Sequence, residues 1–125
     1  MSLRGIRGAI TVDENSREKI WQAARRLVTK IMSANGLRGE DVGAMIFSST
    51  QDLTDAFPST GVRQLTGLRL VPLFDTIEPE VENSLPLCIR VLILADIDKR
   101  QSEVCHVYLD GAKNLRPDLE KAMGN

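Results

Sequence analysis

The feature that most constrains the fold of this sequence is its small number of helical segments. One long segment, residues 16–36, carries apolar residues at helical spacing, and a shorter helix is expected from Pro58 to about residue 66. About five other segments show the alternation or the short apolar runs that are typical of β-strands. Two helices leave one face of such a sheet uncovered. The sequence therefore predicts an α+β (mixed α/β) fold that buries its open sheet face in a symmetric oligomer.

The expected strands follow one another with turn residues between them. In residues 4–12, Ile6 and Ile10 share one face, and Arg7 lies on the other. The other strands are expected at residues 42–49, 71–75, 88–95 and 104–109, with a polar loop at residues 50–55. No linker or repeat separates these segments, so residues 1–125 are expected to form one domain with residues 112–125 as its tail.

The long helix carries signals at both of its ends. Asn15 and Ser16 offer a cap, and Glu18 follows Asn15 at the spacing of a capping box. Asn35 and Gly36 are expected to end the helix, because glycine readily adopts the left-handed conformation found after a helix C-terminus. The sequence thus defines this helix better than any other element.

The charge and the composition exclude several classes of function. Sixteen Lys and Arg residues balance seventeen Asp and Glu residues, for a net charge of -1, and no basic stripe is present for nucleic acid. The longest apolar run, residues 91–95, is too short to span a bilayer, so we expect a soluble, cytoplasmic protein. Cys88, Cys105 and His106 are too few for a conventional zinc site, and we expect no metal.

Two arginines stand in segments that should be strands. Arg90 interrupts a strongly apolar run, and a guanidinium there needs an anionic partner because it does not deprotonate. A structural ion pair and a bound anionic ligand explain Arg90 equally well. Arg7 alone would be an exposed residue at a strand edge, yet the two arginines together indicate a ligand with two negative charges.

Three further side chains belong with these arginines. Glu78 follows the third strand and either belongs to a solvated acidic loop or orients a buried arginine. His106 and Tyr108 share one face of the last strand, where the histidine acts as a general base or, more commonly, forms structural hydrogen bonds. No nucleophile motif or phosphate loop is present, so these residues are suited to binding a small polycarboxylate and to stabilising charge electrostatically.

A set of short sequence motifs, spread over nearly the whole chain, resembles one protein family. The motifs are RGIRGAITV (4–12), DL (52–53), AFP (56–58), VPL (71–73), CIRV (88–91), HVYL (106–109) and LRPDL (115–119). In this order they resemble the monofunctional chorismate mutases of the trimeric pseudo-α/β-barrel type. The resemblance implies a homotrimer with active sites between neighbouring subunits. It also implies the Claisen rearrangement of chorismate to prephenate in aromatic amino acid biosynthesis, without a cofactor.

The resemblance also implies roles for particular residues. Arg90 would face the ether oxygen of the substrate, Arg7 would bind a carboxylate with support from Tyr108, and Glu78 would hold Arg90 and accept from the ring hydroxyl. The remaining residues implied for the cleft are Phe57 and Phe74 in the ring pocket, Arg63 from the adjacent subunit, and Leu115 and Arg116 in a closing tail.

The sequence departs from the family pattern at two of these positions. Thr60 stands where a lysine is frequent, so one cation at the rim of the cleft is missing. Asp75 replaces a smaller Cys or Ser, and we expect Asp75 and Glu78 to share a proton near neutral pH. Two other functions remain open for this architecture, namely a trimeric enamine/imine deaminase and a non-catalytic trimer that binds a metabolite.

Overall fold

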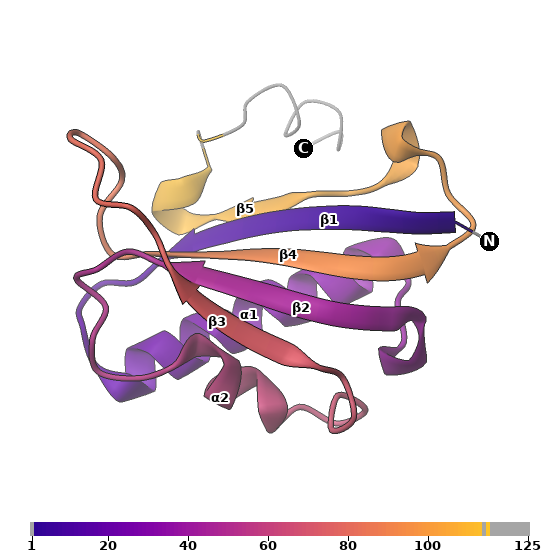
Figure 1. Cartoon of the computed structure of the whole chain (residues 1–125), viewed down its shortest axis with the longest axis horizontal. Helices are drawn as coiled ribbons and strands as arrows, with labels where there is room; N and C mark the ends of the chain where they lie inside the picture. The colour runs from indigo at the N-terminus through magenta and orange to yellow at the C-terminus, as the bar shows by residue number, and fades with distance from the viewer. Residues whose placement is uncertain (1, 114, 116–125) are drawn as a thin grey trace.

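The computed structural model describes residues 2–113 and residue 115 (Figure 1). In this part of the chain, five strands and two α-helices follow one another in a single sequence of elements. They are β1 (Ser2–Thr11), α1 (Arg17–Asn35), β2 (Val42–Ser49), α2 (Pro58–Arg63), β3 (Leu73–Ile77), β4 (Cys88–Ile97) and β5 (Val107–Leu109). Short 3₁₀ turns at Gly39–Asp41, Gln101–Glu103 and Asp110–Ala112 were not expected from the sequence.

The strands form one mixed sheet in the order β3-β2-β4-β1-β5. The central strand β4 is antiparallel to both β1 and β2, whereas β5 pairs with β1 and β3 pairs with β2 in parallel. Helices α1 and α2 lie together against one face of this sheet (Figure 1). No helix of the described residues covers the other face, which confirms the predicted fold class and its open face.

The core lies between the sheet and α1. Ile6 and Ile10 of β1 and Leu27 and Ile31 of α1 are fully buried there. Each such side chain contributes about 1.5–3 kcal/mol when it leaves water. A Cβ atom at Gly8 would lie 2.7 Å from Ile31 Cδ1, so this glycine allows α1 to approach the sheet.

The ends of α1 agree with the sequence, except for one detail of its cap. Ser16 caps the helix by accepting a hydrogen bond from Lys19 N at 3.2 Å, and Gly36 follows it with a φ of 62°. The expected capping box is wrong, because Glu18 occupies the second helical position rather than the third. The side-chain amide of Asn15 instead donates through Nδ2 to the hydroxyl of Thr54 and accepts through Oδ1 from Thr54 N.

Strand β5 is shorter than expected because side chains replace its first backbone pairings. The buried amide of Asn35 donates to Cys105 O and accepts from Cys105 N, each at 2.8 Å. These two bonds satisfy the backbone of Cys105 as a neighbouring strand would. Residues 104–106 are therefore anchored without belonging to the ladder, which begins at the pair of Gly8 and Val107.

Other boundaries differ from the expected ones by a few residues. Strand β3 begins at Leu73, because Pro72 lacks the N–H needed for a ladder. Helix α2 ends at Arg63 rather than near residue 66, and β4 continues to Ile97, where it still pairs with Ser2. Among the described helices, none is both long and apolar enough to cross a membrane.

Candidate active site

One row of side chains crosses the open face of the sheet and contains two of the expected site residues. Arg90 of β4 lies opposite Ala9 of β1, and Ala9 lies opposite Tyr108 of β5. Directly paired residues share a face, so the Arg90 and Tyr108 side chains rise from the open face on either side of a small alanine. The row continues through Ser48 and Thr76 on the other side of Arg90. Ala9 thus leaves room between a cation and a phenol.

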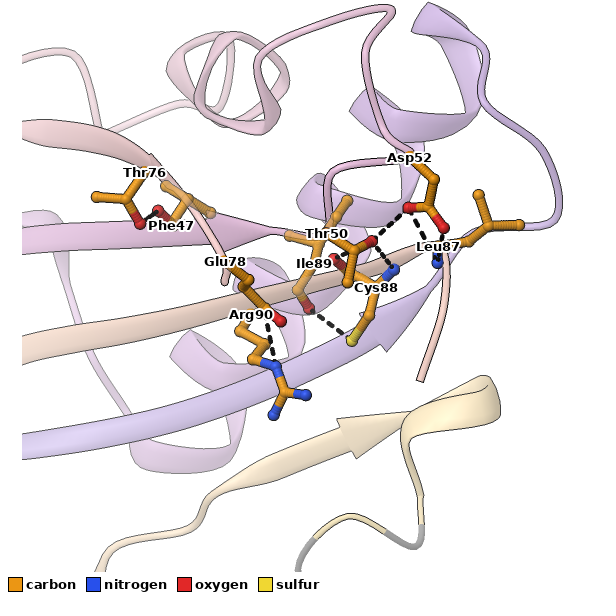
Figure 2. A network of polar contacts seen from close by, with 9 residues as sticks. All are labelled: Phe47, Thr50, Asp52, Thr76, Glu78, Leu87, Cys88, Ile89 and Arg90. Atoms are coloured by element: carbon orange, nitrogen blue, oxygen red, sulfur yellow. Dashed lines mark hydrogen bonds and ion pairs between the residues drawn. The ribbon is translucent and has the colours of Figure 1, made fainter. Parts of the chain in front are cut away.

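Arg90 forms an ion pair with Glu78, as the sequence suggested. Glu78 Oε1 lies 2.7 Å from Arg90 Nε, and the two side chains are 14% and 31% exposed. Glu78 Oε1 is buried and makes this contact without the alignment of a hydrogen bond. Figure 2 shows that the terminal guanidinium nitrogens of Arg90 point away from Glu78. The carboxylate therefore orients Arg90 through one nitrogen and leaves the other two for a ligand.

The backbone of Glu78 is fixed by β2 and by the turn that follows it. Glu78 N donates to Ser49 O at 2.9 Å, which extends the pairing of β2 and β3 by one bond. Glu78 O accepts from Gln51 Nε2 at 3.1 Å. Both contacts hold the Glu78 carboxylate beside β4. Of the two interpretations of this acidic segment, Glu78 therefore fits the residue that orients a buried arginine, not a solvated loop.

Arg7 lies next to this row on the open face. It pairs with Leu92 of β4, two residues along each strand from the pair of Ala9 and Arg90 and therefore on the same face. Its side chain is exposed, and its backbone N–H donates to Nδ1 of His106 at 2.9 Å. Since Nδ1 accepts this bond, His106 acts here as a structural hydrogen-bond partner, the more common of its two expected roles.

Tyr108 belongs to a small apolar cluster. Ala9, Cys88, Tyr108 and Ala112 are buried in it, and Leu115 packs against it. Burial raises the pKa of the Cys88 thiol to about 11, an effect that the positive charge of Arg90 partly offsets and that Glu78 and Asp52 reinforce. Of the two expected tail residues, Leu115 therefore reaches Tyr108's cluster, whereas Arg116 lies outside the described residues.

A second group of expected site residues gathers around α2. Phe57 and Asp75 line an open hollow of about 600 Å³, and Phe57 is 67% exposed. Asp75 accepts hydrogen bonds from the N–H and the hydroxyl of Ser59. Thr60 is exposed on α2, whereas Phe74 is exposed on the open face of β3 and so lies on the same side of the sheet as the first group.

Arg63 has a structural contact that the sequence did not indicate. Its Nη1 lies 2.8–3.1 Å from the carbonyl oxygens of Leu68, Arg69 and Val71. It therefore fixes the turn between α2 and β3 with one nitrogen.

The two groups of residues do not meet within one protomer. Asp75 pairs with the buried Phe47 and so faces the helices, whereas Arg90 pairs with Ser48 and faces the opposite way. Asp75 and Glu78 therefore have separate partners in the protomer, because Ser59 binds one carboxylate and Arg90 binds the other. Adjacent positions on a pleated strand point to opposite faces, and short sequence motifs alone do not show which residues share a face.

Comparisons with known proteins agree with this geometry. The chain belongs to the family described as chorismate mutase type I, whose sequence pattern matches residues 3–119. It is 51% identical over 121 residues to chorismate mutase AroH of Thermus thermophilus, covering 96% of this chain and 98% of that protein. It is 42% identical over 119 residues to chorismate mutase AroH of Bacillus subtilis, covering 95% and 94% of the two chains.

A solved structure supports the same assignment. The chorismate mutase from Clostridium thermocellum superposes with a TM-score of 0.85 at 37% identity, covering 88% of this chain and 97% of that one. The function of the present chain is therefore that of a chorismate mutase, an isomerase of aromatic amino acid biosynthesis, with chorismate as its substrate.

Sequence reasoning missed several residues that organise this region. Asn35 anchors the segment before β5, and Thr50 and Asp52 bind the backbone at the start of β4. The available signal was a short polar side chain directly after a predicted strand or at a helix end, where unpaired backbone groups need partners.

Proposed function

We propose that the chain rearranges chorismate to prephenate in a cleft shared by two subunits of a homotrimer, with Arg90 as the principal catalytic residue. The observation that carries this proposal is the contact of Arg90 Nε with Glu78 at 2.7 Å, which leaves the terminal nitrogens for a ligand. The reaction is unimolecular and needs no cofactor. Its rate depends on groups that are already in place before the substrate binds.

Arg90 would act on charge that develops during the reaction. The carbon–oxygen bond to the enolpyruvyl group breaks ahead of carbon–carbon bond formation, so negative charge grows on the ether oxygen. A fixed guanidinium interacts more strongly with that oxygen in the transition state than in the substrate, and this difference accelerates the reaction. Glu78 orients the guanidinium and accepts a hydrogen bond from the ring hydroxyl.

The neighbours of Arg90 would bind the substrate and hold it in its compact conformer. Arg7 binds a carboxylate from the adjacent row of the open face, and Tyr108 supports it from β5. Chorismate is flexible, and the cleft must select the compact conformer in which the two reacting carbons approach each other. Positioning of this kind needs no proton transfer from the protein.

The proposal of a homotrimer is supported by the exposed apolar residues and by the division of the site. Phe74 and Leu92 are 65% and 36% exposed on the open sheet face. The group around α2 lies apart from Arg90 in one protomer, so a neighbouring subunit would bring it to the cleft. That second group comprises Phe57, Thr60, Arg63 and Asp75, whereas Phe74 would line the ring pocket from the open face itself, and the tail residues Leu115 and Arg116 would close over the cleft.

We propose further that residues 1–125 act as one domain in the cytoplasm. Both cysteines carry free thiols, with Cys88 buried and Cys105 half-buried, a state that a reducing compartment maintains. Prephenate formed there would be available to the later steps of aromatic amino acid biosynthesis.

The first test is direct turnover without metal or cofactor. Purified protein is mixed with chorismate, and loss of chorismate and formation of prephenate are followed for the wild type and for Arg90→Ala. We expect turnover by the wild type and a rate about 10²–10³ lower in the variant. A folded protein that leaves chorismate unchanged would favour the deaminase or the metabolite-binding trimer.

The shared cleft is tested by mixing two inactive variants. Arg90→Ala damages one half of the cleft, and Phe57→Asp damages the half expected from the adjacent subunit. After the two are unfolded and refolded together in equal amounts, about a quarter of the clefts of a cyclic trimer combine two intact halves. Recovery of that fraction of activity supports the shared cleft, and no recovery argues against it.

A further inference from the structure

We propose that Asp52 is a positioning residue for Arg90, because its carboxylate fixes the backbone at the start of β4. Both carboxylate oxygens accept from the N–H of Leu87, at 3.0 and 3.2 Å (Figure 2). Leu87 lies immediately before β4 and three positions before Arg90. The inference rests on the catalytic role proposed above for Arg90.

Leu87 has a backbone conformation that needs such support. Its φ is 50°, in the left-handed region that leucine rarely adopts. Its N–H is bound by Asp52, and its carbonyl oxygen accepts from Val12 N at 2.8 Å. Asp52 therefore offsets the cost of a conformation that sets the direction in which β4 begins.

Thr50 binds the next residue of the chain, Cys88, and together with Asp52 it forms a clamp on the backbone at the start of β4. Its hydroxyl accepts from Cys88 N at 2.9 Å and donates to Asp52 Oδ1, and its own N–H donates to Cys88 O at 3.0 Å. The ladder between β2 and β4 ends at the pair of Ser49 and Ile89. Beyond that pair, one backbone bond from Thr50 and the side chains of Thr50 and Asp52 hold the start of β4, and Figure 2 shows the side-chain contacts.

The turn at residues 50–52 fixes both partners of the catalytic ion pair. Gln51 binds the carbonyl oxygen of Glu78, while Thr50 and Asp52 bind the strand that carries Arg90. A displacement of about 1 Å in a group that must meet the transition state can lower a rate by about 10²-fold. Loss of the clamp should therefore reduce kcat, because Arg90 is proposed to act on the transition state.

The test compares two substitutions at residue 52. Asp52→Ala removes the acceptor of Leu87 N, and we expect kcat to fall about 10- to 100-fold with KM changed less than about threefold. Asp52→Asn retains an oxygen acceptor and should restore kcat to within about threefold of the wild type. If Asp52→Ala lowers the melting temperature but leaves kcat per folded protein unchanged, Asp52 is merely structural and the proposal is wrong.

Two further variants keep the proposal testable if Asp52→Ala does not fold. Thr50→Val removes the hydroxyl of the clamp, whereas Thr50→Ser retains it. We expect kcat to fall in Thr50→Val and to remain near the wild-type value in Thr50→Ser. Equal values of kcat in the two variants would overturn the inference.

Combination with Arg90→Ala separates this inference from the proposed function. If Asp52 acts through Arg90, Asp52→Ala should add less than about a twofold loss to the turnover that remains in Arg90→Ala. A full further loss would show that Asp52 acts by another route. If Arg90→Ala itself retains wild-type turnover, the catalytic role of Arg90 is wrong, whatever the effect of Asp52.

Asp41 offers a matched control at the other end of β2. Its carboxylate accepts from the N–H of Arg38 at 2.8 Å, so it also binds a backbone amide next to a strand. We expect Asp41→Ala to retain the kcat of the wild type. A loss equal to that of Asp52→Ala would mean that any weakened turn lowers kcat, and the specific role of Asp52 would be excluded.

Discussion

The backbone N–H of Arg7 donates a hydrogen bond to Nδ1 of His106 at 2.9 Å, at the point where β5 has not yet begun to pair with β1. A backbone N–H is always a donor, so Nδ1 carries no proton and the neutral ring is protonated at Nε2. The imidazole thereby takes the place of the carbonyl group that a longer β5 would offer. This contact joins the strand of Arg7 to the segment that precedes Tyr108.

We expect His106 to affect substrate binding more than the chemical step. His106→Leu removes the acceptor of Arg7 N, and one net hydrogen bond of about 0.5–1.5 kcal/mol corresponds to an increase in KM of about 2- to 13-fold. His106→Asn places an oxygen near the position of Nδ1 and should recover most of the affinity. Steady-state kinetics with chorismate measures both values, and a fall in kcat alone would contradict the expectation.

Replacement of Arg90 by citrulline separates its charge from its shape. The neutral side chain keeps the planar outline, but a carbonyl oxygen replaces one terminal nitrogen and its donors, so we expect correct folding and a kcat about 10²–10³ lower. Semisynthesis followed by single-turnover kinetics gives the chemical rate directly. A variant that retains most of the rate would mean that the positive charge is unimportant.

Leu92 provides a test of assembly. It is 36% exposed in the protomer and lies on the open face, so a charge placed there would be buried in the proposed trimer. We expect Leu92→Asp to yield monomers in sedimentation velocity experiments, with loss of turnover. Leu70→Asp is the matched control, since Leu70 is 82% exposed and precedes β3 in a turn. Dissociation of both variants, or of neither, would contradict the assignment of the interface.

The ion pair of Arg26 with Asp110 predicts a small dependence of stability on pH. Arg26 Nη1 lies 2.9 Å from Asp110 Oδ2, and hydrogen bonding to Arg26 lowers the pKa of Asp110. Stability from this pair is present above the unfolded-state pKa of about 3.9 and is lost as the pH falls through the folded-state value. Both side chains are about half exposed, so screening limits the contribution to a few tenths of a kcal/mol.

Asp110→Asn isolates this contribution. Asparagine tolerates the φ of 54° at this position, so the substitution removes the charge without new backbone strain. Urea unfolding should show a lower free energy of unfolding for the variant at pH 7, and the difference between the two proteins should shrink as the pH falls below about 3.9. A difference that persists undiminished at that acidic pH would have a cause other than the ion pair.

The two thiols should differ in their reaction with iodoacetamide. The buried Cys88 thiol, with a pKa raised to about 11, has almost no thiolate at pH 8, whereas Cys105 is half-buried. Intact mass spectrometry of the native protein should therefore find one modification at Cys105, and the denatured protein should carry two. Rapid modification of Cys88 in the native state would mean that the cluster that contains Cys88 and Tyr108 opens readily.

The sequence predicted elements best where local signals and burial agree. The stripe of α1 and its end at Gly36 are local features, and the alternation in β1 placed Arg7 on the open face. The start of β5 was not predictable in the same way, because it depends on the side chain of Asn35, 70 residues away from Cys105. Strand propensity in residues 104–106 carries no information about that contact.

The ion pair of the candidate site was predictable from the sequence, whereas the arrangement of the other residues was predictable only in part. Arg90 needed a carboxylate, and Glu78 supplies it. The position of Asp75 on the helical face follows from the pairing of β3 with β2, which no pattern in the single sequence specifies. Asp52 lay in a predicted polar loop, and its role depends on a partner at Leu87, 35 residues further along the chain.

The clamp at Leu87 has a consequence for how sequences with this fold can change. Residues 79–86 connect two fixed points, Glu78 beside Ser49 and Leu87 beside Asp52, and most of these residues are exposed. Insertions or deletions between those points should be tolerated, because they alter neither anchor. A single-residue insertion between Leu87 and Arg90 would instead turn the guanidinium toward the core. Variation in length is thus expected to concentrate before the clamp and to be excluded after it.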